Sequence, residues 1–245
     1  MIGGHPLAVL AHLGTGGALA GCVSSTGNDS GDAVDNNDNG IDNANPQTNG
    51  IVSVPISLVP NTEPTNDGDG ANANQTIDFG FYPPVNLGNA IWKDLDNNGL
   101  KDANEPGING VTVELYRETN GTPGLQIGGD TFVGSQSTAG GGLYQFTGLQ
   151  PGGYYVFVPA SNFAQPNGML AGCFSSTPDD PTPDNNEDND DNGVSGPNGG
   201  IVTGIITLTG GAEPVNDGDG ADGNQTVDLG FYPPVNVGNL VWKDN

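Results

Sequence analysis

Oxygen-bearing side chains recur at a fixed spacing between Asp94 and Glu105, a segment that we call the first loop. It reads Asp-Leu-Asp-Asn-Asn-Gly-Leu-Lys-Asp-Ala-Asn-Glu and fits the pattern D-x-[DN]-x-[DN]-G-x5-E at every defined position. Ca²⁺ takes about six to eight oxygen ligands, and this spacing supplies them while Gly99 permits a tight turn. The expected ligands are the side chains of Asp94, Asp96, Asn98, Asp102 and Glu105 and the main-chain carbonyl of Leu100. The sequence therefore predicts a calcium site.

Two further kinds of acidic cluster occur, each in two copies. Neither kind has a glutamate at the last position of the pattern, so each needs ligands from elsewhere in the chain. One kind comprises Asp188, Asp190 and Asn192, with the earlier copy Asp35, Asn37 and Asn39. The other comprises Asp217 and Asp219 with Glu213 upstream, with the earlier copy Asp67, Asp69 and Glu63. For these clusters, calcium binding and ordinary turns capped by Asp or Asn side chains both remain open.

The segments that flank the first loop favour a structural ion over a switch. A predicted strand precedes the loop and Pro106-Gly107 follows it. A calcium sensor needs helices that swing open, and this sequence predicts none here. We therefore expect the ion to stiffen a β scaffold.

Internal repetition indicates which elements position these loops. The segment Pro83–Asp94 returns as Pro233–Asp244, an offset of 233 − 83 = 150 residues, so that Trp92 and Trp242 are equivalent. Such agreement in strands and loops alike predicts one module type in tandem. The expected segments are an unassigned stretch 1–13, the C-terminal half of a module at 14–82, a Pro-rich linker at 83–86, a complete module at 87–232, a second linker at 233–236 and the first strand of a further module at 237–245.

Short alternating runs separated by Gly, Pro, Asn and Asp predict an all-β fold. At this module length we expect an immunoglobulin-like antiparallel β-sandwich, with Trp92 in its core. Because the predicted strand 201–209 separates them, the clusters around Asp190 and Asp217 are expected at opposite ends of the module. The expected strands are 87–93, 110–117, 126–135, 143–147, 153–159, 169–175, 201–209 and 225–232.

The charge balance excludes several kinds of partner. The sequence has 29 acidic and 4 basic residues, and the resulting formal charge of −25 repels nucleic acid and anionic membranes. No continuous apolar stretch is long enough to span a bilayer, so we expect no membrane insertion. The natural counter-charge is a metal cation.

Residues suited to catalysis are sparse. The two histidines, His5 and His12, lie outside the repeat, and the Asp-rich loops suit ion ligation better than acid–base chemistry. We therefore expect a protein that is not an enzyme. Cys22 and Cys173 occupy equivalent positions of successive modules, so we expect no disulfide between them.

These motifs together resemble the B repeats of serine-aspartate-repeat surface proteins of Gram-positive bacteria, the SdrD B-like domains. The resemblance rests on Gly88–Val113 and Gly142–Tyr154 and covers most of 86–232. It implies a sandwich of the collagen-adhesin B type that binds Ca²⁺ through the first loop and serves as a rigid extracellular spacer on the bacterial surface. The module is longer than a short B repeat because of Met169–Gly220, so the resemblance assigns no ligands to the other clusters.

Two alternatives to a passive stalk remain. An adhesive sandwich would bind a carbohydrate or a host protein, using a tyrosine surface. Its expected residues are Tyr116, Tyr144, Tyr154 and Tyr155. A self-assembling fibre would use the strand 237–243 of one chain to complete the half module 14–82 of another by strand addition. The expected partners are therefore calcium ions together with neighbouring modules or other copies of the chain.

Overall fold

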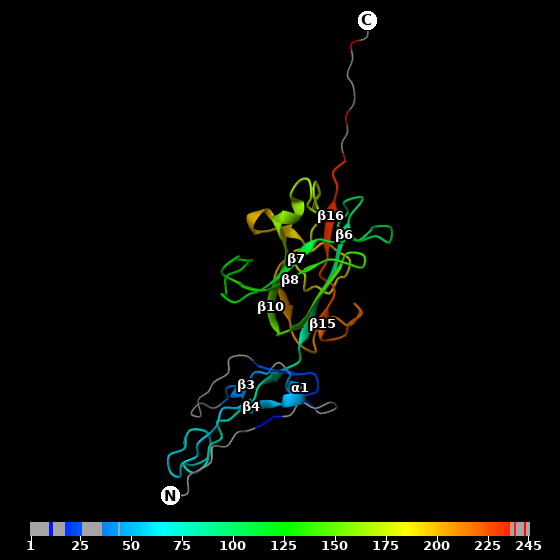
Figure 1. The fold of residues 1–245 in the computed structure, drawn as a ribbon. Coiled ribbons are helices and arrows are strands. Elements are labelled where there is room, and N and C mark those ends of the chain that lie inside the picture. Colours follow the sequence, from blue (N-terminus) through cyan, green and yellow to red (C-terminus); the bar gives the residue numbers. More distant parts are fainter. Residues whose placement is uncertain are drawn as a thin grey trace. The chain divides into compact units, whose positions relative to one another are not determined.

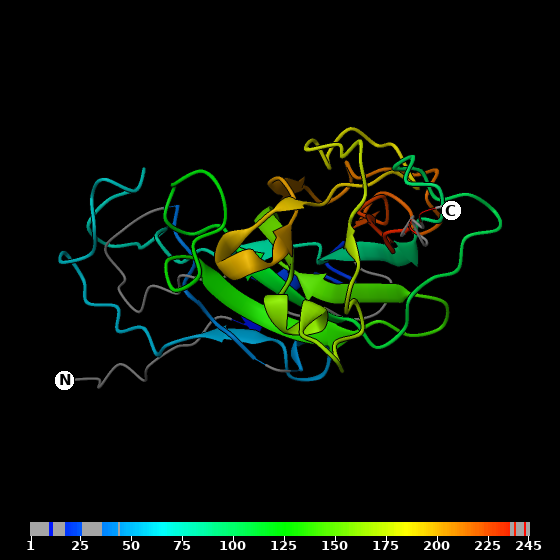
Figure 2. The same ribbon diagram turned by 90° about the horizontal axis from the view of Figure 1, so that it is seen from above.

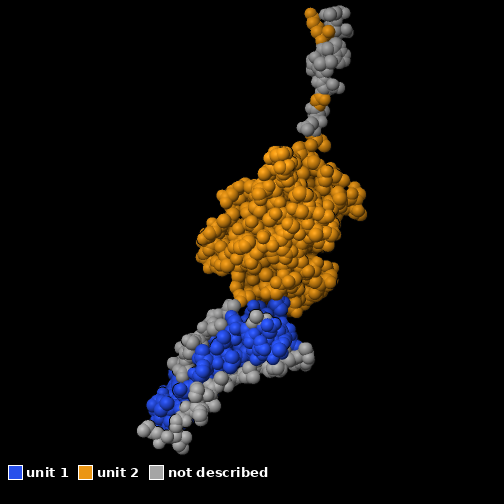
Figure 3. Space-filling view, in the orientation of Figure 1, with its two compact units in different colours: residues 1–84 blue, residues 85–245 orange. Residues whose placement is uncertain are grey.

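A computed structural model describes residues 10–11, 18–25, 36–43, 45–235, 238 and 243. The chain divides into two compact units, residues 1–84 and residues 85–245, which Figure 3 colours blue and orange. We call them unit 1 and unit 2.

Strands account for most of the regular structure in both units. In unit 1 the elements are β1 (Leu10–Ala11), β2 (Val23–Ser24), β3 (Gly40–Ile41), α1 (Pro46–Asn49), β4 (Ile51–Ser53) and β5 (Phe81–Tyr82). In unit 2 the longer strands are β6 (Val85–Lys93), β7 (Thr112–Arg117), β8 (Thr131–Ser137), β9 (Leu143–Leu149) and β10 (Gly152–Val158). The shorter elements of unit 2 are η1 (Ala160–Phe163), β11 (Phe174–Ser175), β12 (Val194–Ser195), η2 (Pro197–Gly199), β13 (Ile201–Val202), β14 (Ile206–Leu208), β15 (Gly223–Asn224) and β16 (Leu229–Tyr232).

Two sheets make up the sandwich of unit 2 (Figure 1; Figure 2). One sheet has the strand order β12-β13-β10-β7-β8, and β14 also pairs with β10. The other has the order β11-β16-β6-β15, and β9 also pairs with β6. The pairings in unit 2 are antiparallel, except that β6 runs parallel to β15 and β16. The predicted β-sandwich is confirmed, with one mixed sheet.

The core of unit 2 lies between its two sheets. On β7, the buried Val113 and Leu115 alternate with the half-exposed Thr112 and Glu114, which is the pattern that predicted a strand. Fully burying each such aliphatic side chain contributes about 1.5–3 kcal/mol. The core also includes Leu87, Ile91, Val156, Ile206, Leu229 and Phe231.

Trp92 is fully buried, which confirms its predicted place in the interior. It packs against Gly230 on β16, where a Cβ atom would come within 2.7 Å of the indole ring. The equivalent Trp242 lies outside the described residues.

Local hydrogen bonds divide or shorten several expected strands. The segment 201–209 forms β13 and β14, because the Thr203 hydroxyl accepts the hydrogen bond of Val156 N–H (3.1 Å) in place of a main-chain carbonyl. Only β11 forms within 169–175, because Cys173 N–H closes a turn onto the Leu170 carbonyl (2.9 Å). The expected strand 126–135 begins in a turn at 128–129 and yields β8, at 131–137. The expected strand 225–232 is regular only in β16, at 229–232.

Unit 1 repeats part of the strand pairing of unit 2. β4 pairs with β3 as β13 pairs with β12, and β5 pairs with β2 as β16 pairs with β11. β1 pairs with β4 in the same way as β10 pairs with β13. Leu10 is opposite Val52 in unit 1, and Phe157 is opposite Val202 in unit 2. The stretch 1–13 therefore contributes a strand to unit 1. The expected strand at 237–245 lies outside the described residues, apart from two isolated positions.

Both cysteines, Cys22 and Cys173, are free thiols. Within the described residues, no helix has the length and apolar character that crossing a lipid bilayer requires.

Candidate metal centre

The first loop starts where β6 ends and is folded around one carboxylate. Asp94 N–H donates to the Phe231 carbonyl (3.0 Å), which ties the start of the loop to β16. The Asp94 side chain is fully buried. Its carboxylate accepts hydrogen bonds from the N–H groups of Asn97 (2.6 Å) and Gly99 (3.0 Å).

Glu105 closes the first loop. Its Oε1 accepts a hydrogen bond from Leu95 N–H (2.6 Å), and its Oε2 accepts one from Asp102 N–H (3.1 Å). Asp94, Asp96 and Glu105 each place a carboxylate oxygen within 4.8 Å of the other two. Three convergent carboxylates are the hard oxygen ligands that Ca²⁺ prefers.

Burial and hydrogen bonding act in opposite directions on the charge of Asp94. Burial raises the pKa of its carboxyl, but hydrogen bonds from main-chain N–H groups, led by that of Gly99, outweigh burial and leave the pKa below its ordinary value. Asp94 is therefore ionised at neutral pH, and the carboxylate is the form that binds a cation.

The remaining predicted ligands of the first loop lie outside this group of three. The Asn98 side-chain oxygen accepts a hydrogen bond from Leu100 N–H (2.7 Å), and its amide donates to Asp96 (3.3 Å). Asp102 is exposed. At Leu100 the predicted ligand is the main-chain carbonyl, and the main chain of Leu100 forms a β-bridge with that of Asp190.

A second acidic segment, residues 177–193, lies directly against the first loop, and we call it the second loop. Lys101 N–H donates to the Asn189 carbonyl (2.7 Å), and Asp191 N–H donates to the Gly99 carbonyl (3.0 Å). Gly99 has a φ of 75°, and a Cβ there would come within 2.2 Å of a carbonyl oxygen of the second loop. Glycine is thus required both by the turn and by the contact between the loops.

Asp190 lies beside two acids that the sequence pattern did not single out. Asp180, Glu187 and Asp190 each place a carboxylate oxygen within 4.8 Å of the other two. The only signal for Asp180 and Glu187 in the sequence is the run of acids that surrounds them, because their spacing follows no loop pattern.

The other predicted members of this cluster have structural partners. Asp188 is exposed. The Asn192 side-chain oxygen accepts a hydrogen bond from Asp228 N–H (2.9 Å). The fully buried carboxylate of Asp228 accepts from Ala90 N–H on β6 (2.8 Å) and from Asn189 N–H in the second loop (3.0 Å). Asp228 therefore fastens the second loop to β6.

The third cluster lies at the other end of β6, as the sequence predicted. Asn86, near the start of β6, donates its N–H to the Asp222 carbonyl (2.9 Å), and Gly223 pairs with Asn86 in the sheet. The first loop instead follows the C-terminal end of β6, and the second loop lies against the first loop. One ion therefore does not serve both ends.

Carboxylate oxygens of the third cluster are buried without partners. Asp217 Oδ2 accepts a hydrogen bond from Gln225 N–H (2.8 Å), but Asp217 Oδ1 and both oxygens of Asp219 have none. Burial, followed by the nearby charge of Asp217, raises the pKa of Asp219. Glu213 is buried and accepts a hydrogen bond from Thr209 N–H (2.5 Å).

Unit 1 repeats the contacts of the third cluster. Asp67 Oδ2 accepts a hydrogen bond from Gln75 N–H (2.9 Å), and both oxygens of Asp69 are again buried without a partner. Glu63 accepts from Val59 N–H (2.5 Å). The repeat therefore extends from the sequence to individual hydrogen bonds.

The copy of the second cluster in unit 1 is described only in part. The Asn39 side-chain oxygen accepts a hydrogen bond from Asp78 N–H (2.8 Å), as that of Asn192 does from Asp228. Asn37 is half-buried, and Asp35 lies outside the described residues.

Comparison with known proteins points to one family. Residues 85–204, which carry β6 and both loops, match the family described as SdrD B-like domain. Residues 85–204 are an SdrD B-like domain. The chain is 34% identical over 174 residues to serine-aspartate repeat-containing protein F of Staphylococcus epidermidis, covering 70% of this chain and 8% of that protein. It is 33% identical over 211 residues to serine-aspartate repeat-containing protein D of Staphylococcus aureus strain Newman, covering 85% of this chain and 12% of that protein. Neither name denotes an enzyme, and the chain spans only a small part of either relative.

The tyrosine surface expected for an adhesive role is absent from the SdrD B-like domain, so this prediction was wrong. The four tyrosines are between 2% and 7% exposed, namely Tyr116, Tyr144, Tyr154 and Tyr155. Tyr144 packs in the main core and Tyr116 in a second hydrophobic cluster, while Tyr154 and Tyr155 are both buried because β10 is covered on both faces. Tyr154 packs in the main core, whereas Tyr155 packs with Leu125 and Val202 in this second hydrophobic cluster.

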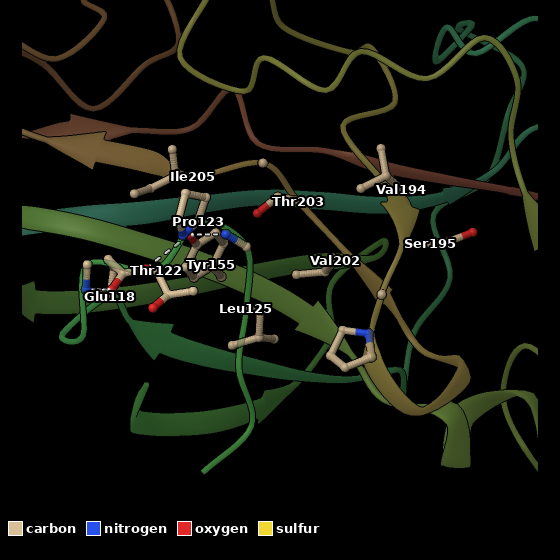
Figure 4. A pocket seen from close by; sticks show the side chains of 15 residues that line it. Glu118, Thr122, Pro123, Leu125, Tyr155, Val194, Ser195, Val202, Thr203 and Ile205 are labelled. Atoms are coloured by element: carbon tan, nitrogen blue, oxygen red, sulfur yellow. Dashed lines mark hydrogen bonds between the residues drawn. The ribbon is translucent and has the colours of Figure 1, made fainter. Parts of the chain in front are cut away.

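A cavity of about 730 Å³ opens beside this second cluster of the SdrD B-like domain (Figure 4). The hydroxyl of Tyr155, in its wall, donates to Glu118 (3.2 Å) and accepts a hydrogen bond from Gly124 N–H (3.0 Å). Leu125 and Val202 add apolar surface. The Tyr155 hydroxyl is therefore already paired within the protein.

Proposed function

We propose that this chain belongs to a structural array at the surface of a bacterium, in which Ca²⁺ bound in the acidic loops stiffens each module into part of an extracellular stalk. The observation that carries the proposal is the convergence of Asp94, Asp96 and Glu105 within 4.8 Å. A cation there replaces repulsion among three carboxylates by attraction and joins the two ends of the first loop.

The charge of the whole chain supports a cation as partner. Four basic residues cannot neutralise 29 acidic ones. The acids are also concentrated in loops that recur in both units, as Asp67 and Asp217 do with the same main-chain contact. Cations would therefore relieve repulsion at several places along the chain.

The scaffold supports a structural ion. Lys93 N–H donates to the Pro106 carbonyl (2.9 Å), and the main chain of Trp92 forms an antiparallel β-bridge with that of Gly107. Both ends of the first loop are therefore fixed to β6. Ca²⁺ in this loop has no hinged helices to move, and its effect is to hold the loop closed.

The likeness to serine-aspartate repeat-containing proteins supports the surface location and the stalk role. An array of modules of one type is suited to spanning distance rather than to catalysis.

Isothermal titration with Ca²⁺ tests the proposal. The variant Asp94→Asn/Glu105→Gln removes two of the three convergent carboxylates, and we expect it to bind one ion fewer than the unaltered chain. The control Glu114→Gln/Asp222→Asn removes the same charge outside the three convergent carboxylates. Asn72 occupies the place of Asp222 in unit 1 and makes the equivalent hydrogen bond, so this control keeps the local structure. Equal stoichiometry in both variants would contradict the proposal.

A stalk and a self-assembling fibre differ in how the chain sediments. For a stalk we expect one species in millimolar Ca²⁺ at every protein concentration. Analytical ultracentrifugation measures this directly, and species that grow with concentration would favour the fibre.

A further inference from the structure

Two long strands of unit 2 have a neighbour on one side only. Within the described part of the unit, most strands of this kind are short, since β11, β12 and β15 have two residues each and β14 has three. β8 and β9 have seven residues each, and they pair only with β7 and β6, respectively. The open side of such a strand presents main-chain N–H and C=O groups with which a further strand can pair. β8 and β9 are therefore the two edges suited to strand addition.

The edge of β9 is already occupied by a side chain. The Gln136 side-chain amide, on β8, donates to the Gln145 carbonyl, and the Gln136 side-chain oxygen accepts a hydrogen bond from Gln145 N–H (3.3 Å). Gln145 lies inside β9, so both main-chain groups at this point have partners. Among the described residues, no side chain caps the main chain of β8 in this way. β8 is thus the more accessible of the two edges.

β8 has few of the features that protect an exposed edge from pairing. Natural edges are very short, carry charged side chains or proline, or are twisted by a bulge. β8 reads Thr-Phe-Val-Gly-Ser-Gln-Ser, and the stretch without Asp, Glu, Lys or Arg continues to residue 178. One bulge occurs, because Gly134 pairs with Leu115 and Phe132 with Tyr116. From Gly134 to Ser137 the pairing with β7 is regular, so this part of the edge can accept a strand.

Two exposed apolar side chains lie on the same strand. Phe132 is 53% exposed and Val133 is 42% exposed. The Phe132 ring packs edge to face on the buried ring of Tyr116, with 5.4 Å between the ring centroids. An added strand that covers Phe132 and Val133 removes apolar surface from water, which favours binding. The main chain of β8 therefore supplies hydrogen bonds, and these two side chains supply apolar contact.

We propose that β8 is a docking edge for an extended segment of a basic partner protein, which adds to the sheet beside β8. The segment is neutral where it lies along β8, because residues 131–178 offer no charge to pair with. The partner is basic because the chain as a whole has a formal charge of −25, which attracts cationic proteins. A second copy of the chain does not fit, since two such copies repel each other. Main-chain pairing supplies the affinity in this mode of recognition, and side-chain contacts supply the specificity.

Amide hydrogen exchange of the full chain in Ca²⁺ tests the proposal, with a synthetic peptide as the probe. The peptide acetyl-Lys-Val-Thr-Val-Thr-Val-Lys-amide is neutral in its centre and basic at its ends. We expect it, at millimolar concentration, to slow exchange of main-chain N–H groups within 131–137 by about 5-fold or more. A second form, in which the N–H groups of all Val and Thr residues are methylated, keeps the side chains but cannot pair. We expect it to leave exchange unchanged. A third form with Glu at both ends should protect β8 about 5-fold less.

One variant and its matched control locate the contact. Phe132→Ser removes an exposed apolar side chain from β8, and Leu143→Ser removes one of equal exposure (50%) from β9. We expect Phe132→Ser to weaken peptide binding by about 5-fold or more and Leu143→Ser to leave it unchanged. Far-ultraviolet circular dichroism checks that both variants are folded.

Several results would overturn the docking edge. They are unchanged exchange within 131–137 in the presence of the first peptide, equal protection by its methylated form, and equal weakening in Phe132→Ser and Leu143→Ser. Equal protection by the peptide with Glu ends would overturn the basic partner. Protection of β8 that increases with protein concentration in the absence of peptide would show a second copy as the occupant, and would overturn the basic partner too.

Discussion

Chelation of calcium is expected to lower the melting temperature of the chain by about 5–10 °C. An ion that binds only the folded state contributes about 2.7 kcal/mol at 100 times its Kd, and each kcal/mol shifts the melting temperature of a domain this size by about 2–4 °C. Without the ion, Asp94, Asp96 and Glu105 repel one another within 4.8 Å. Differential scanning calorimetry in millimolar Ca²⁺ and in EGTA measures the shift.

Limited proteolysis shows which part of the chain opens when calcium is removed. Lys101 N–H is bonded to the Asn189 carbonyl when the first loop is closed, and trypsin is expected to cut after Lys101 in EGTA and not in Ca²⁺. In Ca²⁺, the variant Asp94→Asn/Glu105→Gln should melt at a lower temperature than the unaltered chain. EGTA should then lower its melting temperature by less. Identical melting curves with and without chelator would refute the structural role of calcium.

Replacing Asp228 by alanine is expected to lower the free energy of unfolding by about 2–4 kcal/mol. The substitution leaves the N–H groups of Ala90 and Asn189 without their acceptor, and an unsatisfied buried donor costs about 1–3 kcal/mol. Burial raises the pKa of the Asp228 carboxyl well above its ordinary value, while the Asn189 N–H opposes that shift. Urea denaturation followed by tryptophan fluorescence measures the loss.

Graded substitutions show whether the lost acceptors are the cause. Asp228→Asn keeps one oxygen but presents an amide NH₂ to the second N–H, so we expect an intermediate loss. Asp222→Asn, an exposed change that unit 1 carries naturally as Asn72, should change stability by less than about 0.5 kcal/mol. Equal stability of Asp228→Ala and Asp222→Asn would show that Asp228 does not fasten the second loop.

The first loop was predictable because its chemistry is local. The acids that converge come from one stretch, and the hydrogen bonds of Gly99 and Leu95 that fold it lie within the same stretch. The alternation of Val113 and Leu115 and the interior place of Trp92 were equally visible, because one buried face per strand leaves a period of two.

The partners of Asp190 were not predictable from spacing. Asp180 and Glu187 reach it only because the second loop crosses the first, and main-chain bonds such as that from Asp191 N–H to the Gly99 carbonyl decide this crossing. No side-chain pattern encodes such bonds. The role of Asp228 was hidden for the same reason, since its partner on β6 lies 138 positions away.

The tyrosines were misplaced because alternation predicts one buried face per strand. On β10 both faces are covered, so the residues from Tyr154 to Val158 are all buried. The face of β10 that carries Tyr155 is covered by Leu125 and Val202, which lie in segments that the strand pattern does not connect with β10.

The parallel pairing of β6 with β16 bears on how unit 2 carries tension. Ile91 is paired with Leu229 and Lys93 with Phe231, so the first and last strands among the described residues of unit 2 lie side by side and run in the same direction. A force that pulls the two ends of the unit apart drags these strands past each other along their length. The hydrogen bonds between them are then loaded together in shear instead of opening one after another, and the first loop lies at the end of this pairing, where Asp94 N–H holds Phe231. An ion that keeps the loop closed would thus reinforce the joint that bears the mechanical load.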